Sequence, residues 1–151
     1  MAGFSIYDDD FVKQLDSLAS GFDDIAREGL EKAAPYLVQT MKKEARQAVR
    51  HEGESEMVNS ILAKKPKKTK NGDWVLNVVP TGYTTHTYTR GRKGKRVRKY
   101  RLSNAAKMVW LEYGNRGGRQ AARPFIAKAT KDAETDVLNA IQGALNERID
   151  K

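Results

Sequence analysis

The spacing of apolar residues predicts long helices in the first third of the chain. Over residues 11–25 apolar side chains recur at intervals of three and four, which is the spacing of one helix face. The stripe continues along a second, longer helix from about Phe22 to Arg50, with a break expected near Ser20–Gly21. Pro35 lies inside this second helix and is expected to kink it, because proline removes one backbone donor. Asp8–Asp10 suit the N-terminal cap of the first helix.

The middle of the chain has the pattern of short antiparallel strands. A strand begins at Ser60–Ala63 and leads into a cluster of lysines. Lys70–Asp73 predicts a tight turn, since Asn-Gly supplies the positive φ angles of a two-residue hairpin. The return strand runs from Trp74 to Val79, and Pro80 stops it.

A second hairpin, residues 82–102, is here called the basic hairpin. Its expected strands, Tyr83–Tyr88 and Arg96–Leu102, are rich in threonine, tyrosine and valine, and Gly91–Gly94 resembles the tip. The charged residues from position 90 to position 101 are all basic: Arg90, Arg92, Lys93, Lys95, Arg96, Arg98, Lys99 and Arg101. Because unpaired charges are costly to bury, we expect the basic hairpin to project from the body.

The last third predicts a short helix and a long one. Ser103 or Asn104 caps a helix that ends at Tyr113–Gly114, and a loop through Gly117 and Gly118 follows. Pro124 suits the first position of the last helix, whose apolar stripe continues from Phe125 to Ile149. Helices are segregated from strands along the chain, which favours an α+β fold in one domain over residues 1–151.

Charge is concentrated in the middle of the chain. The 151 residues carry a net charge of +9, and 31% of them are charged. Residues 64–101 hold thirteen basic residues against one acid, Asp73, so this segment carries +12 and the rest of the chain −3. A localised basic block predicts one charged face or arm, whereas a uniformly basic chain would suggest general nucleic-acid coating.

Candidate chemistry is sparse. The chain has no cysteine, which excludes disulfides, thiolate zinc sites and cysteine nucleophiles. His51 and His86 lack a second histidine at metal-ligand spacing, and Glu52, Glu54 and Glu56 resemble a solvated loop. No phosphate-loop, dinucleotide or serine-hydrolase motif is present. We therefore expect no catalytic residue, no cofactor and no metal. The first ten residues lack the apolar run of a signal peptide, and no stretch approaches the ~20 apolar residues of a membrane span, which predicts a soluble, intracellular product.

Two interpretations of the basic hairpin stay open on the residues alone. Eight basic residues interleaved with Tyr88 and Tyr100 suit a phosphate-backbone binder, since each neutralised phosphate releases counterions and tyrosine stacks on bases. The same residues suit an arm that docks on an acidic protein surface. The lysines at positions 64 to 70 are more typical of a charged strand edge that prevents aggregation.

The segment Met108–Ala129 reads MVWLEYGNRGGRQAARPFIAKA and carries a resemblance. It resembles the small tail-completion or neck proteins of long-tailed bacteriophages, in which a Glu-aromatic-Gly unit is followed by a loop and an Ala-x-Pro-Phe element that opens the last helix. The matching residues are Glu112, Tyr113 and Gly114, then Ala122, Arg123, Pro124 and Phe125. Val58–Ile61 is similar to the family's strand start. Two features depart from the family: Asn115 stands where threonine is frequent, and the basic hairpin is longer and more charged.

The resemblance implies a non-enzymatic virion protein of the neck. It implies a hexameric or dodecameric ring that lies between a head-closure connector and the tail tube or terminator. The ring is expected to assemble in the bacterial host cytoplasm. The genome would pass through it with at most transient DNA contact, and no membrane contact is expected. The same motif residues have mechanical roles available: Gly114 at a helix end, Phe125 in the core, and Glu112 as an acceptor for loop amides. The alternatives are a nucleic-acid-binding module that uses the basic hairpin, and a tail terminator in a headless phage-derived particle.

Overall fold

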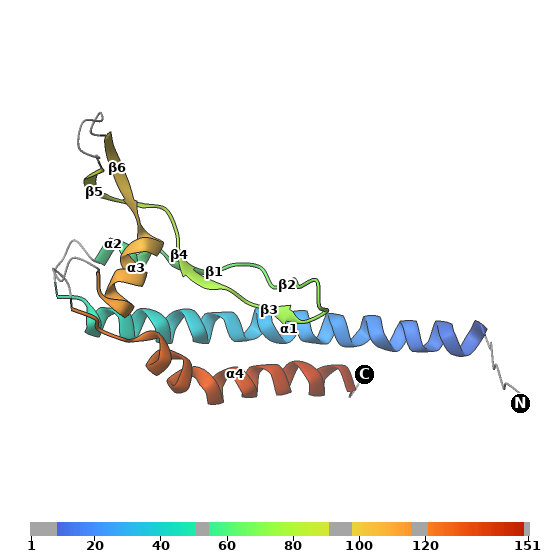
Figure 1. The fold of residues 1–151 in the computed structure, drawn as a ribbon. Helices are drawn as coiled ribbons and strands as arrows, with labels where there is room; N and C mark the ends of the chain where they lie inside the picture. Colours follow the sequence, from blue (N-terminus) through green and yellow to red (C-terminus); the bar gives the residue numbers. More distant parts are fainter. Residues whose placement is uncertain (1–8, 51–54, 91–97, 116–120, 150–151) are drawn as a thin grey trace, which may run out of the picture.

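A computed structural model describes residues 9–50, 55–90, 98–115 and 121–149 (Figure 1). Long helices at both ends and small antiparallel strand pairs confirm the expected α+β class. The elements in chain order are α1 (Asp9–Ala48), α2 (Ser55–Asn59), β1 (Ile61–Ala63), β2 (Lys67–Lys68), β3 (Trp74–Val75), β4 (Val78–Pro80), β5 (Tyr83–Arg90), β6 (Arg98–Ser103), α3 (Asn104–Tyr113) and α4 (Ile126–Ile149).

Helix α1 is one continuous helix of 40 residues. The break expected near Ser20–Gly21 is therefore wrong. A single glycine in a helix costs only about 1 kcal/mol relative to alanine. Leu15, Phe22 and Gly29 are seven residues apart, so the apolar stripe keeps the same face on both sides of Gly21. Pro35 lies inside α1 without ending it.

Helix α4 packs antiparallel along the C-terminal two-thirds of α1 (Figure 1). Small residues allow the close approach: Ala33, Ala133 and Ala144 are fully buried. At Gly29 a Cβ atom would lie 3.3 Å from the Cα atom of Ile141, so a larger side chain would push the two helices apart. The apolar stripe expected for the last helix is thus its contact with α1.

The strands form three separate two-stranded antiparallel pairs, β1–β4, β2–β3 and β5–β6. A tight turn is present, but it is not the two-residue hairpin that was predicted: Gly72 has φ 94°, Asn71 has no positive φ, and the Thr69 amide donates to the Asp73 carbonyl over 2.8 Å, which leaves three residues between them. The expected return strand is interrupted between β3 and β4, where the Asn77 carbonyl accepts from the Lys64 amide. Pro80, expected to stop the strand after Val79, is itself the last residue of β4 and pairs with Ile61.

The hydrophobic core lies at one end of the molecule, where the C-terminal half of α1 meets α2, β1, α3 and the start of α4. Its most buried members are Met41, Ala45, Met57, Val58, Ile61, Leu111, Phe125 and Ala129. The N-terminal part of α1 extends past every other element, and β5–β6 projects from the core end (Figure 1). The accessible surface is 11716 Å², whereas a compact monomer of 17.0 kDa exposes about 7700 Å². The chain therefore exposes far more surface than a globule of its mass.

Candidate functional site

Glu112 joins the end of α3 to the start of α4. Its side chain is 7% exposed, and its Oε2 atom accepts the backbone amides of Phe125 over 2.8 Å and Ile126 over 3.1 Å. These amides belong to the first residue of α4 and the residue before it, at the helix N-terminus, where backbone donors have no partner inside the helix and a negative charge is favoured. The expected role of Glu112 as an acceptor for loop amides is confirmed, and the carboxylate caps a helix 13 residues further along the chain.

The Ala-x-Pro-Phe element holds α4 against α1 and α3. The Arg123 amide donates to the Leu111 carbonyl over 2.7 Å, and its guanidinium donates to the Ala48 carbonyl at the end of α1 over 2.9 Å. Phe125 is 2% exposed and fills the core, as expected. Pro124 was expected at the first position of the last helix, and this is wrong: α4 begins at Ile126, because the Phe125 carbonyl accepts the first helical bond, from Ala129.

Of the other motif residues, Gly114 ends a helix and Tyr113 lies on the surface. Gly114 has φ 75°, a left-handed value that glycine adopts without strain, and it ends α3 where the sequence predicted. Tyr113 is 75% exposed. Ser103, one of the two expected caps of α3, accepts the Ala106 amide over 3.1 Å. The loop residues Gly117 and Gly118 lie outside the described residues.

An ion pair closes the α1–α4 contact beside this motif. Glu44 of α1 is 3% exposed, and its carboxylate accepts from the Lys128 ammonium of α4 over 2.5 Å. The hydrogen bond with Glu44 raises the pKa of Lys128 above its usual value. The second carboxylate oxygen of Glu44 has no hydrogen-bond partner among the described residues. Glu44, Arg123 and Phe125 line a polar hollow at the end of the two helices.

Strands β5 and β6 extend away from the core (Figure 1), and half of the predicted contact residues of the basic hairpin lie in them. The β5–β6 register places Arg90 opposite Arg98 and Thr87 opposite Arg101. Alternate strand positions belong to opposite faces, so basic positions fall on both faces of the pair, Lys99 and Arg101 on one and Arg98 on the other. Arg92, Lys93, Lys95 and Arg96 lie outside the described residues. Nearer the base the pair packs on the body, since Thr84 of β5 is 1% exposed and Leu102 of β6 is 8% exposed.

The base of the basic hairpin is tied to α2 and α3 by polar contacts that sequence analysis missed. Glu56, expected in a solvated loop, lies in α2, and its carboxylate accepts the Thr85 amide over 3.2 Å. Asn104, 4% exposed, donates from its side chain to the Thr81 carbonyl over 2.6 Å. Because these partners are 23 to 29 residues apart, no local pattern indicates them.

Asp23 ties the β2–β3 turn to α1. Its carboxylate accepts from the Lys68 ammonium over 2.5 Å and from the Trp74 indole over 2.9 Å. The hydrogen bond with Lys68, and then the one with Trp74, lower the pKa of Asp23 below its usual 3.8. Lys68, expected only as part of a charged strand edge, therefore also anchors the β2–β3 turn on the helix.

The described part of the chain gathers no group of three or more metal-ligating side chains. His51 lies outside it, and the His86 backbone lies in β5. Among the described helices, none has the length and apolarity that crossing a membrane requires.

A family model described as "Bacteriophage HK97-gp10, putative tail-component" matches residues 9–114, about two-thirds of the chain. The match takes in α1, the strands, α3 and the Glu112–Gly114 unit, and it ends before the element around Pro124. No curated protein and no solved structure matches the chain. The matched span, together with the Glu112 unit within it, places the chain in the HK97-gp10-like family of bacteriophage tail components.

Proposed function

We propose that this tail component is a neck protein that forms a ring between the tail tube and the head connector and lets the genome pass through its centre. The observation that carries the proposal is the family match over residues 9–114, because that family is one of phage tail components. A role as a structural part of the virion follows from the family. The non-catalytic character, the ring, its position in the neck and the passage of DNA are the proposed part.

The large exposed surface supports assembly. The chain exposes roughly 4000 Å² more than a compact monomer of its mass, from the values above. Interfaces of obligate assemblies bury about 2000–5000 Å². An exposed surface of this size suits a subunit that contacts neighbours on more than one side, which is what a closed ring with head-to-tail contacts requires.

The residues at the helix-end junction have mechanical roles in this proposal. Glu112, Arg123 and Phe125 hold the ends of α1, α3 and α4 together through hydrogen bonds and core packing. These contacts connect the end of α1 to α3 and to the start of α4, and a connected junction of this kind suits a subunit of the proposed joining ring.

We assign the basic hairpin to protein docking in preference to DNA. A channel through which DNA slides gains nothing from eight phosphate contacts, because such contacts bind with steep salt dependence and hold the genome in place. Its basic positions on both faces suit an acidic surface of an adjacent virion protein.

The test of the function is removal of the gene from a phage that encodes it. The expected result is an accumulation of packaged heads and separate tails that fail to join, with joining restored by the gene in trans. Electron microscopy of complete particles should then show density for a tagged copy at the neck. Normal particles in the absence of the gene, or the tag at the distal tail tip, would refute the proposal. A tagged copy at the neck of headless particles would favour the tail-terminator alternative.

A further inference from the structure

The side of α3 that points away from the core has the composition of a covered surface. Helix α3 is ten residues long and carries two charged residues, Lys107 and Glu112. Its inner side packs on the core through Leu111, which is 2% exposed, and through Met108. With about 100° between successive residues, the positions on the opposite side of the helix are Ala105, Ala106, Val109, Trp110 and Tyr113. None of these five residues is charged.

This set of five residues is here called the α3 outer face. Val109 is 49% exposed, Tyr113 is 75% exposed, and Ala105 is exposed as well, whereas Ala106 and Trp110 are half-buried. A surface helix normally carries charged and polar residues on its solvent side. Single exposed apolar residues are common and need no explanation, but a contiguous set of them marks an interaction site. The α3 outer face therefore has the pattern of a surface that a partner covers.

The charged residues that border the α3 outer face are basic. Strand β6 ends at Ser103, which is also the N-terminal cap of α3, so the strand leads directly into the helix (Figure 1). Over β6 and α3 the charged residues are Arg98, Lys99, Arg101 and Lys107, against Glu112. Glu112 is buried and accepts two amides at the start of α4, so the charge that a partner meets here is positive. An apolar surface with a basic border complements an apolar surface with an acidic border.

We propose that the α3 outer face binds an apolar, acidic-bordered surface of an adjacent virion protein, next to the docking site of the basic hairpin. The inference deepens the proposed function and rests on it for the presence of an adjacent virion protein. Duplex DNA does not fit, because its phosphates gain nothing from an apolar helix face, and interfaces with DNA are polar and positively charged. A second copy of the chain carries a net charge of +9, so repulsion disfavours it at this basic end.

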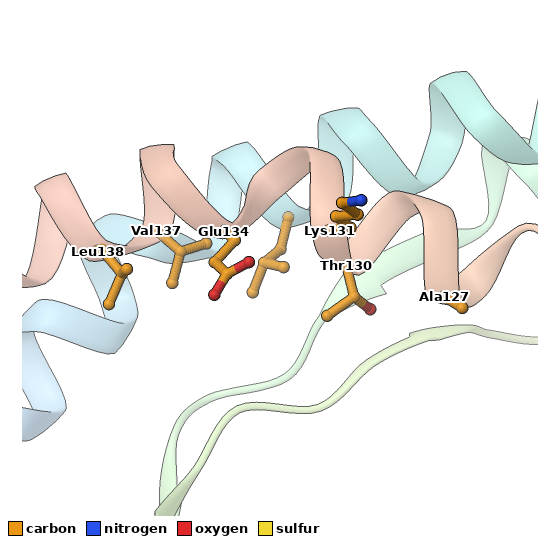
Figure 2. A pocket seen from close by; sticks show the side chains of 7 residues that line it. Ala127, Thr130, Lys131, Glu134, Val137 and Leu138 are labelled. Carbon is orange, nitrogen blue, oxygen red and sulfur yellow. The ribbon is translucent and has the colours of Figure 1, made fainter.

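The hollow between α1 and α4 is another apolar surface, but it lacks this charge pattern. Its volume is about 400 Å³, and Figure 2 shows the side chains of α4 that line it. The charged residues in the lining are Lys131 and Glu134, one of each sign. Charge therefore selects no partner for the hollow, whereas it selects an acidic partner for the α3 outer face.

Photo-cross-linking in assembled particles identifies the partner. Val109 of the full chain is replaced by p-benzoylphenylalanine in a phage that depends on this copy, and the purified particles are irradiated. We expect an adduct with a different virion protein, and mass spectrometry should show a cross-linked peptide that combines apolar residues with a net negative charge. The control carries p-benzoylphenylalanine at Asn139, an exposed polar position of α4. The control should give at least tenfold less of this adduct.

Substitutions of Val109 test the charge of the partner. Val109→Asp removes the apolar contact and adds a charge of the partner's sign, so the phage titre in complementation should fall at least a hundredfold. Val109→Lys also removes the apolar contact but adds the opposite charge, so its loss should be at least tenfold smaller. Asn139→Asp should leave the titre unchanged. The urea midpoints of the purified variants should match that of wild type, because Val109 is half exposed.

An adduct with a second copy of the chain, equal adducts from the Val109 and Asn139 positions, or a cross-linked peptide without net negative charge would overturn the docking proposal. A wild-type titre for Val109→Asp, or an equal loss for Val109→Lys, would overturn it as well. These outcomes leave a tagged copy at the neck of the particle, so the docking proposal can fail while the proposed function stands. A tag at the distal tail tip, together with the expected adduct, would refute the function alone.

Discussion

Replacing Glu112 by alanine tests whether the motif works as a brace between helices. The substitution leaves two amides at the start of α4 without an acceptor, those of Phe125 and Ile126. The carboxylate is 7% exposed, so water does not readily replace it. A hydrogen bond to a charged group contributes about 1.5–3 kcal/mol, and a buried donor left without a partner costs about 1–3 kcal/mol. Because both bonds share one oxygen, we expect a total loss of about 3 kcal/mol.

Glu112→Gln removes the negative charge of the side chain but keeps an oxygen that can accept hydrogen bonds. The amide oxygen of glutamine can still accept both bonds, so the loss should be near 1 kcal/mol, since only the charge-assisted part disappears. Glu31→Ala is the matched control, because Glu31 is an exposed glutamate on α1. Surface substitutions of this kind stay within about 0.5 kcal/mol of wild type.

Urea unfolding at neutral pH measures the three variants, with the free energy taken from the midpoint and slope. Amide hydrogen exchange at Phe125 and Ile126 gives a local readout, which should accelerate in Glu112→Ala before global unfolding is reached. A loss for Glu112→Ala no larger than that of Glu31→Ala, with unchanged exchange at both amides, would refute the cap and the reasoning built on it.

Three further predictions follow from contacts away from Glu112. Pairing lowers the pKa of Asp23, so the stability from its carboxylate is present above pH about 3.8 and lost as pH falls through the lower folded value. The difference in urea midpoint between wild type and Asp23→Asn should therefore shrink between pH 6 and pH 2, and a constant difference would contradict this. Gly29→Leu should cost about 2 kcal/mol by overpacking against α4, whereas Gly21→Ala, with open space around it, should stabilise by about 0.5–1 kcal/mol. Thermal unfolding measures both, and equal effects would contradict the close helix approach. Neutralising the basic hairpin should abolish head–tail joining in complementation assays. The unaltered subunit should bind duplex DNA weakly at 200 mM salt. Submicromolar DNA binding that is lost when the basic hairpin is neutralised would favour the nucleic-acid alternative.

Local patterns predicted the parts of the fold that depend on neighbouring residues. The positive φ of Gly72, the Ser103 cap and the end of α3 at Gly114 each depend on a few adjacent residues whose backbone angles and side-chain reach are set by their chemistry. The stripe of the last helix was also predicted, because its contact with α1 extends over several turns. Such features need no knowledge of the rest of the chain.

Two local predictions were wrong because packing or hydrogen bonds with other parts of the chain decided the outcome. Gly21 does not break α1, since the apolar face is continuous on both sides of it and one glycine costs little. Pro124 does not start α4, since Glu112 caps the helix at Phe125 and Ile126. In both cases the residue has the expected preference, and the surrounding packing or hydrogen bonds outweigh it.

The ties made by Asp23 and Glu56 were not predictable at all. Each joins side chains tens of residues apart, and an isolated aspartate or glutamate in a polar stretch has the pattern of a solvated residue. Only the positions of α1, α2 and the strands bring the partners together. Polar contacts of this kind are decided by the fold, so a single sequence gives no signal for them.

The position of the core explains why neighbours should complete this molecule. Its apolar residues are concentrated where α2, α3 and the start of α4 meet α1, and the basic hairpin begins outside that cluster. An isolated two-stranded hairpin is marginal in water. In the proposed ring we therefore expect the surface of an adjacent virion protein to stabilise the basic hairpin, so that this end of the subunit contacts that protein while other surfaces contact neighbouring copies.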